Sequence, residues 1–381
     1  MFDGNLFAKN LREARKRRGM SQRELAEKLF LSTQAVSKWE QGETTPDVSR
    51  LCDLAAVLQT SVDCLLGASD GGEIAYIGID GGGTKTEFIL LSQEGQLLKR
   101  LVLPGSNPNI CTVDGACEIL RNGIDTMMQQ GRRVLGVFLG GSGMSSGGNG
   151  QAIEAALRNT YPGLAVRCET DICNLLAFAD DPDNAIAVIC GTGSVVFATR
   201  DGVLQRFGGG GWKLETDGSG YDLGRQAILA ALEHRDGTGK ATCLTEAVEE
   251  KLGGKVWGNI GKLYAEPPAY LASLAPAVLS AWQQGDEVAS AIVERNCARL
   301  RHLVLTAAEH SPSARQVLLG GSILMKNEPF RNRLFSQLPQ KLEATVPQYP
   351  QVLGACLRCA AMLSLPKPDA ETFMKQYAME E

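Results

Sequence analysis

Two glycine-rich turns, far apart in the chain, contain the residue types that bind phosphate groups. The first reads Asp80-Gly81-Gly82-Gly83-Thr84-Lys85-Thr86, and the second reads Gly191-Thr192-Gly193-Ser194. Glycines let a turn present bare backbone N–H groups, and Thr and Lys side chains add further donors for phosphate oxygens. Two such turns in one chain predict that a nucleoside triphosphate is held from both sides. The alternative for either turn alone is an ordinary tight turn.

Apolar runs flank both turns and predict the strands that must position them. Ile74–Ile79 and Phe88–Leu91 enclose the first turn, and Ile186–Cys190 and Val195–Ala198 enclose the second. Each turn therefore joins two predicted strands. The first turn leads into a strand-like run. It is therefore not the type of phosphate-binding loop that is followed by a helix. Further downstream, strands alternate with helices, which is consistent with an α/β domain.

With both turns in place, nearly all of residues 74–365 resembles the sugar kinase, heat-shock ATPase and actin superfamily, most closely N-acetylglucosamine kinases and BadF/BadG-type ATPases. This resemblance implies a ribonuclease H-like α/β domain of two duplicated halves, residues 74–181 and 182–381, with ATP and Mg²⁺ as cofactors. Each half contributes one phosphate hairpin, which assigns the ATP phosphates to Gly82, Gly83, Thr84, Lys85, Gly191, Thr192 and Gly193. The strand Val317–Leu319 and the following Gly320, Gly321 and Ser322 resemble the family's adenosine motif.

Two aspartates are candidates for the chemistry of phosphoryl transfer. Asp80 is the expected Mg²⁺ partner, because Mg²⁺ prefers hard oxygen ligands and often binds through water; the alternative is an Asx turn. Asp171 follows the predicted strand Ala165–Cys168 and precedes the predicted helix Ile172–Ala179, the edge at which open α/β sheets place ligand groups. In the resembling kinases, an aspartate here accepts the proton of the attacking sugar hydroxyl. The alternative for Asp171 is a helix N-cap.

The candidate sugar contacts lie on loops. The resemblance implies Asn107, Ser142 and Gly143, and the alternative for each is turn chemistry. Farther along, Glu215-Thr216-Asp217 stands where the kinases read Gly-Asp-Glu, so Thr216 replaces the sugar-contacting aspartate of the family. Asp217 is the remaining acid that we expect to reach a hydroxyl.

Residues 1–67 predict a separate helical domain, followed by a short polar linker at residues 68–73. Ser21-Gln22-Arg23-Glu24 is a capping box that opens a helix, and Ser32 caps a second helix, Thr33–Gln41, which Gly42 ends. Two short helices with a tight connection match a helix-turn-helix. The sequence from Met20 onward resembles XRE-type, lambda-repressor-like DNA-binding domains.

Charge and the resemblance together predict duplex DNA as a partner of this domain. Between Lys9 and Lys38 there are nine basic and three acidic residues, although the whole chain has a net charge of −5. A basic patch on an acidic protein indicates a polyanionic partner. The family positions that meet base edges correspond here to Thr33, Gln34, Ser37 and Lys38, with Gln22 on a phosphate. The alternative is a helical interaction module that does not bind DNA.

The whole chain narrows the remaining choices. Its 381 residues contain no apolar run of membrane-spanning length and no signal pattern, so we expect a cytoplasmic protein, and the DNA-binding domain leads us to expect a homodimer. The Cys356-Leu357-Arg358-Cys359 motif lies in a predicted helix and is expected to be buried packing. Three functions remain open: a kinase of a sugar or amino sugar fused to a DNA-binding domain, a regulator that only senses sugar and nucleotide, and an ATPase that activates a partner enzyme.

Overall fold

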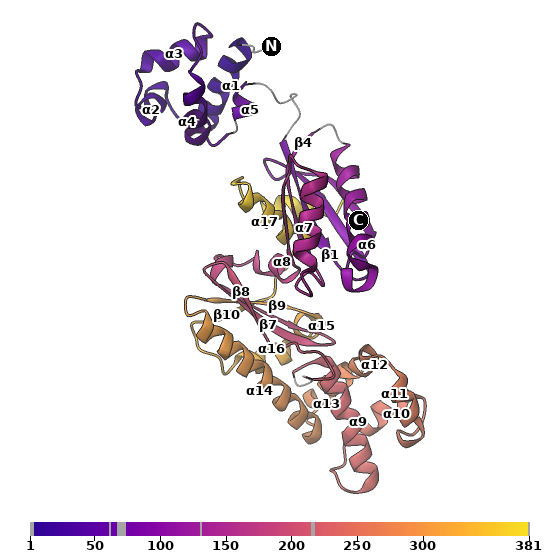
Figure 1. Cartoon of the computed structure of the whole chain (residues 1–381). Coiled ribbons are helices and arrows are strands. Elements are labelled where there is room, and N and C mark those ends of the chain that lie inside the picture. Colours follow the sequence, from indigo (N-terminus) through magenta and orange to yellow (C-terminus); the bar gives the residue numbers. More distant parts are fainter. Residues whose placement is uncertain (1–3, 61, 67–73, 130–131, 215–217, 380–381) are drawn as a thin grey trace. The chain divides into compact units, whose positions relative to one another are not determined.

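The computed structural model describes residues 4–60, 62–66, 74–129, 132–214 and 218–379. The chain divides into a unit built on the N-terminal helices and a larger unit that carries most of two β-sheets (Figure 1). No helix among the residues described is long and apolar enough to cross a membrane. The predicted linker at residues 68–73 lies outside the described residues.

The N-terminal unit is a helical domain with its own core. Its helices are α1 (Gly4–Arg17), α2 (Gln22–Lys28), α3 (Thr33–Gln41), α4 (Val48–Leu58) and α5 (Val62–Leu66). The predicted capping box is present: Ser21 Oγ accepts from the Glu24 N–H, and Glu24 Oε2 accepts from the Ser21 N–H. Gly42 ends α3 in the left-handed conformation, with φ of 75°. The core of this domain is apolar and includes Phe7, Leu11, Leu25, Val36, Trp39, Leu54 and Leu65.

The first half of the larger unit is built on a five-stranded sheet. Its strands are β1 (Ile74–Gly81), β2 (Lys85–Ser92), β3 (Leu97–Pro104), β4 (Arg133–Gly141) and β5 (Ala165–Thr170). Strand order is β3-β2-β1-β4-β5, with β2 and β3 antiparallel and β4 and β5 parallel. The helices that follow these strands are α6 (Pro108–Met128), α7 (Asn149–Thr160) and α8 (Ile172–Leu176).

The second half repeats this plan. Its strands are β6 (Ile186–Cys190), β7 (Ser194–Arg200), β8 (Val203–Phe207), β9 (Gln316–Gly320) and β10 (Glu343–Thr345), in the order β10-β9-β6-β7-β8. Strands β6, β7 and β8 are antiparallel, and β9 is parallel to both β6 and β10. A short 3₁₀ turn, η1 (Pro182–Asn184), precedes β6. The longer helices of this half are α9 (Gly220–Asp236), α13 (Ala275–Gln283) and α14 (Glu287–His310).

Smaller helices complete the second half. They are α10 (Leu244–Leu252), η2 (Trp257–Asn259), α11 (Ile260–Ala265), α12 (Pro268–Ala272), α15 (Ser322–Lys326) and α16 (Glu328–Phe335). Helix α17 (Gln351–Met362) then returns to the first half, where it packs against α8 and β2. The same order of strands in both sheets confirms the predicted fold of two duplicated halves.

Close packing of α17 on the first half leaves no room for a side chain at two glycines. A Cβ on Gly78 of β1 would lie 2.5 Å from Cys356 Sγ, and a Cβ on Gly354 would lie 1.9 Å from the Asn174 carbonyl oxygen. Cys356 and Cys359 are both buried, which confirms their predicted packing role. The helix predicted over residues 172–179 ends earlier, at Leu176. A further helix, α18 (Ala370–Tyr377), follows α17 and was not expected from the sequence.

Candidate functional site

Asp171 stands at the start of α8, but its side chain does not cap that helix. Instead, one carboxylate oxygen accepts from Ser142 Oγ at 2.5 Å and the other from Thr170 Oγ1 at 3.1 Å. The backbone links this group to the first hairpin, because the Asp171 N–H donates to Gly141 and the Ser142 N–H donates to Gly81. The Asp171 side chain therefore does not play the N-cap role that was its alternative. Its carboxylate is oriented by two hydroxyls at the end of β5.

Asp80, at the end of β1, is held by a residue that the sequence analysis missed. Asn174 Nδ2 donates to Asp80 Oδ1 at 2.8 Å and to the Gly140 carbonyl at 3.2 Å. Burial raises the pKa of Asp80 to about 6, and the negative charges of Asp171 and Glu87 act in the same direction. Asn174 is fully buried, and its Oδ1 has no hydrogen-bond partner. The sequence signal that could have identified Asn174 is that it is the single amide in the otherwise apolar segment Ile172–Leu176.

This arrangement fits a Mg²⁺ ion bound mainly by water and phosphate. No cluster of three or more His, Cys, Asp or Glu side chains that could hold a metal occurs in the described part of the chain. Mg²⁺ is usually bound by one or two carboxylates together with waters and substrate phosphates, so such a cluster is not required. Asp80 has one carboxylate oxygen engaged by Asn174 and could offer the other.

The first glycine turn is a hairpin whose tip is exposed. The Gly82 N–H donates to the Lys85 carbonyl at 2.9 Å, and residues 83–85 are exposed. The neighbouring loop fits closely behind it, since a Cβ on Gly105 would lie 2.2 Å from the Gly83 carbonyl oxygen. Behind the hairpin, Thr86 Oγ1 donates to Pro104, and Ser106 lies 2.8 Å away. The hairpin is therefore fixed from one side and open on the other.

Lys85 of this hairpin is paired with a buried carboxylate. Lys85 Nζ lies 3.2 Å from Glu87, which also accepts from Arg100 and from the Tyr377 hydroxyl. Burial alone would raise the pKa of Glu87, but hydrogen bonds from Tyr377, Arg100 and Lys85 hold it below its ordinary value. Glu87 therefore remains charged and joins the hairpin to the C-terminal helix α18. This link was not predicted from the spacing of these residues.

The second glycine turn is held by the start of α9. The Gly191 N–H donates to the Gly193 carbonyl at 2.9 Å. The Gly220 and Tyr221 N–H groups donate to the carbonyls of Gly191 and Thr192 at 2.8 and 3.0 Å. Gly220 has no room for a side chain, since its Cβ would lie 2.6 Å from the Gly191 oxygen. Thr192 and Gly193 are exposed at the tip.

The predicted adenosine turn lies beside this second hairpin. A Cβ on Gly191 would lie 3.6 Å from Ser322 Oγ and 3.9 Å from the Gly321 Cα. Gly321 has a positive φ of 84°, and a Cβ there would meet the Cys190 carbonyl at 2.4 Å. Gly320 is the last residue of β9. The structure therefore brings together all the nucleotide residues predicted in the second half.

The predicted sugar contacts also gather in the first half. A Cβ on Gly143 would lie 2.3 Å from Asn107 Oδ1, and Ser142 bonds to Asp171. Asn107 Oδ1 accepts from the Asn109 N–H, as in the Asx turn that was the alternative. Asn149 Nδ2 donates to Asn109 Oδ1 and to the Gly143 carbonyl, both at 3.1 Å. Asn109 and Asn149 were missed. Asp217, together with Glu215 and Thr216, lies outside the described residues.

In the N-terminal domain, α3 has one exposed face. Thr33, Gln34 and Lys38 are exposed and Ser37 is partly exposed, while Val36, Trp39 and Glu40 are buried. This is the face that the sequence analysis assigned to base edges. Gln22, the predicted phosphate contact, donates its side-chain amide to the buried Glu40 at 2.7 Å.

The basic residues of α1, together with the adjoining Arg18, fall into two groups. The Arg15 guanidinium is buried and bonds to both carboxylate oxygens of Glu40, and Arg12 Nη2 donates to the Glu40 carbonyl. Arg15 therefore serves the core of the domain rather than an outer surface. Lys16, Arg17 and Arg18 are exposed and available to a polyanion.

Comparison with known proteins identifies the family of each domain. Residues 77–358 match the model of the BadF/BadG/BcrA/BcrD ATPase family, and residues 11–63 match that of a helix-turn-helix. An N-acetylmuramic acid/N-acetylglucosamine kinase from Clostridium acetobutylicum is 30% identical over 228 residues, covering 57% of this chain and 74% of that protein. An N-acetyl-D-glucosamine kinase from Dictyostelium discoideum is 27% identical over 237 residues, with the same coverage.

The chain is also similar to a solved structure. The putative N-acetylglucosamine kinase from Chromobacterium violaceum has a TM-score of 0.56 and 26% identity, covering 76% of this chain and 98% of that one. The family implies the use of ATP. The chain belongs to the BadF/BadG/BcrA/BcrD ATPase family and carries a helix-turn-helix domain in front of its sugar kinase-like ATPase domain.

Proposed function

We propose that this protein is an ATP-dependent kinase that phosphorylates a hydroxyl of a sugar or amino sugar. The observation that carries the proposal is Asp171, whose carboxylate is turned away from its helix and held by Ser142 and Thr170. A carboxylate in this position can accept the proton of a hydroxyl as that oxygen attacks phosphorus. The relatives named as kinases of N-acetylglucosamine and N-acetylmuramic acid support an amino sugar as substrate.

The other residues take supporting roles in this mechanism. The backbone and side chains of Gly82, Gly83, Thr84, Lys85, Gly191, Thr192 and Gly193 hold the phosphates of ATP. Gly320, Gly321 and Ser322 leave room for adenosine. Asp80 holds Mg²⁺, which neutralises charge on the transferring phosphoryl group when bound. Asn107, Ser142, Gly143 and Asp217 hold the sugar, and Ser142 also orients Asp171.

Phosphate transfer to a panel of sugars tests this assignment. We expect Asp171→Asn to fold, to bind ATP and to lose transfer by about 10²–10⁴-fold, the usual contribution of a positioned base. Asp114→Asn, an exposed change on α6, serves as the matched control and should retain activity. If the wild-type protein transfers phosphate to none of N-acetylglucosamine, N-acetylmuramic acid, glucosamine and glucose, the kinase assignment fails.

Nucleotide binding can be tested separately from transfer. The double variant Lys85→Ala/Thr192→Val changes one residue in each hairpin and should abolish stabilisation of the protein by ATP in a thermal melt. Lys341→Ala, an exposed change outside both hairpins, should leave that stabilisation intact. Unchanged stabilisation in the double variant would show that ATP does not bind at these turns.

A second function is favoured by Thr216, which replaces the aspartate of the family's sugar-binding segment. Under this alternative, the ATPase domain senses sugar and nucleotide without transferring phosphate. Binding of a sugar with no consumption of ATP would support it. The third possibility, activation of a partner enzyme, predicts ATP consumption that no sugar stimulates.

For the N-terminal domain we propose binding to duplex DNA as a homodimer, with Thr33, Gln34, Ser37 and Lys38 of α3 in the major groove. Two half-sites about one helical turn apart are usual for such domains. With a DNA fragment selected for binding, Gln34→Ala should relax sequence preference, whereas Arg17→Ala should weaken binding to all sequences alike. Failure of the full chain to bind any duplex at low salt would exclude this role.

The fusion also leads us to propose that ligands of the ATPase domain change DNA affinity. Linkage requires reciprocity: if sugar and nucleotide shift the affinity for DNA, DNA must shift the affinity for sugar by the same factor. Both titrations should be made at one salt concentration, because DNA affinity depends steeply on salt. Equal DNA affinity with and without both ligands would show that the two domains act independently.

A further inference from the structure

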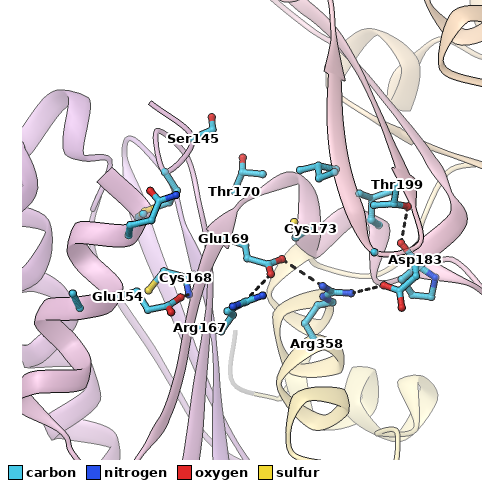
Figure 2. A pocket seen from close by; sticks show the side chains of 18 of the residues that line it. Ser145, Glu154, Arg167, Cys168, Glu169, Thr170, Cys173, Asp183, Thr199 and Arg358 are labelled. Carbon is cyan, nitrogen blue, oxygen red and sulfur yellow. Dashed lines mark hydrogen bonds and ion pairs between the residues drawn. The ribbon is translucent and has the colours of Figure 1, made fainter. Parts of the chain in front are cut away.

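A cavity of about 680 Å³ lies in the larger unit, apart from the residues assigned to ATP and sugar (Figure 2). Its walls come from α7, from β5 and from the β7–β8 turn, with Arg358 of α17 and Asp183 of η1 at one side. Small-molecule sites in proteins usually have volumes of about 300–1,000 Å³. None of the nucleotide, metal or sugar residues proposed above lines it, so its contents would be a separate ligand.

Two guanidinium groups form one wall of this cavity. The Arg158 and Arg167 side chains are 55% and 54% exposed, so both can reach a ligand. Arg158 donates through Nε and Nη2 to the Val166 carbonyl and forms an ion pair with Glu154 at 2.8 Å, and Arg167 donates through Nε to Glu169. These bonds fix both side chains, and among the described residues no hydrogen bond engages the two terminal nitrogens of Arg167. A guanidinium group with both terminal nitrogens available, as in Arg167, suits a phosphate, and Arg158 adds a second positive charge beside its partner Glu154.

The remaining polar wall offers acceptors. Figure 2 shows a row of alternating charges, from Arg167 through Glu169 and Arg358 to Asp183. Arg358 lies 3.4 Å from Glu169 and 3.7 Å from Asp183, so it links β5 of the first half to η1 of the second. The Asp183 side chain is 62% exposed and can accept from a hydroxyl. Each arginine of the cavity thus has a carboxylate beside it, and Asp183 stands at the end of this row.

We propose that this cavity binds a phosphate monoester of a sugar, with its phosphate at Arg158 and Arg167 and its hydroxyls towards Asp183. The choice of sugar phosphate rests on the proposed function, because the kinase would make such a compound. The cavity also adjoins the proposed active site along the chain. Glu169 and Thr170 immediately precede Asp171, and Ser145 lies in the loop that carries Ser142. A product bound in the cavity would therefore contact residues that neighbour Asp171 and Ser142 in the chain.

Calorimetric titration of the full chain tests this proposal. The probes are N-acetylglucosamine 6-phosphate, glucosamine 6-phosphate and glucose 6-phosphate, each titrated with saturating unphosphorylated sugar present to fill the sugar site. We expect at least one probe to bind. Arg167→Gln should weaken that binding by about tenfold or more. Arg167→Lys should weaken it less, because Lys keeps the positive charge but lacks the two parallel N–H donors of the guanidinium group. Arg121→Gln, an exposed change on α6, should have no effect.

The outcomes separate this proposal from the kinase assignment. Binding that responds to Arg167→Gln supports the cavity site even if no sugar is phosphorylated. Three results would overturn it: no binding of any probe, binding that Arg167→Gln leaves unchanged, or equal affinity for inorganic phosphate. Each leaves the transfer assay with Asp171→Asn unaffected, because Arg167 has no part in the proposed catalysis.

Discussion

The buried ion pair of the N-terminal domain predicts a large and local effect of one substitution. Glu40 is 2% exposed and accepts from Arg15 Nε at 2.5 Å, from Arg15 Nη2 at 2.9 Å and from Gln22 at 2.7 Å. Glu40→Gln keeps the shape but leaves the Arg15 guanidinium buried without a counter-charge. Breaking a buried pair in this way costs about 3–5 kcal/mol. A domain of about 60 residues has a free energy of unfolding of about 3–9 kcal/mol, so much of the domain's stability would be lost.

An exposed ion pair in the same domain provides the matched control. Arg23 Nε lies 2.9 Å from Glu27, but the two side chains are 81% and 61% exposed. Because solvent screens such a pair, Arg23→Gln should cost less than about 1 kcal/mol. Amide hydrogen exchange of the full chain, followed on peptides from α2 and α3, reports the stability of this domain directly. We expect fast exchange in Glu40→Gln, near-normal exchange in Arg23→Gln, and unchanged protection of the ATPase domain in both.

The sign of the pH dependence follows from the pKa of Glu40. Burial raises it, but hydrogen bonds from Arg15 and Gln22 and the charges of Arg15 and Arg12 together hold it below its ordinary value. Its stabilising contribution is therefore complete above the unfolded-state pKa and is lost as pH falls through the folded-state pKa. The difference between wild type and Glu40→Gln should shrink on acidification. Equal, small effects of Glu40→Gln and Arg23→Gln at neutral pH would refute the reasoning.

Three further substitutions test other features of the structure. Gly220→Ala places a Cβ 2.6 Å from the Gly191 oxygen, so it should weaken ATP binding and lower the melting temperature, whereas Gly163→Ala, with nothing within 4 Å, should do neither in the same thermal melts. Phe30→Gly relieves a left-handed residue with φ of 56° that is 93% exposed, and urea unfolding should show a gain of about 0.5–1 kcal/mol that Phe30→Ala does not give. Asp80→Asn should abolish the Mg²⁺ dependence of ATP binding without destabilising the free protein, because a neutral amide replaces a carboxylate that burial disfavours; loss of folding would contradict this.

Features with local causes were predictable from the sequence. The capping box at Ser21, the glycine that ends α3 and the two glycine hairpins each depend on residues within a few positions of one another. Strand periodicity then placed Asp171 at the end of β5, where the structure has it. These features depend only on the backbone preferences of neighbouring residues, so they can be predicted without knowledge of the tertiary fold.

Contacts between distant segments were not predictable. Asn174 meets Asp80 across 94 positions, and Tyr377 meets Glu87 across 290. Nothing in the spacing of these residues indicates a partner, because only the packing of α8 and α18 on the sheet brings them together. The same reason explains why the bond between Gln22 and Glu40 was not predicted. The type and position of Gln22 suit a phosphate contact, but the fold places the buried carboxylate of Glu40 within its reach.

The start of α9 limits how the second hairpin can bind phosphate. A helix N-terminus usually attracts anions through its first four N–H groups. Here all four are already engaged: Gly220 and Tyr221 donate to the hairpin carbonyls, and the next two donate to Ser219 Oγ and to the Ser219 carbonyl. The helix therefore orients the hairpin rather than the ligand. Phosphate would be bound by the exposed tip of the hairpin, so a substitution at Thr192 should weaken ATP binding directly, whereas Gly220→Ala should do so only by displacing the hairpin.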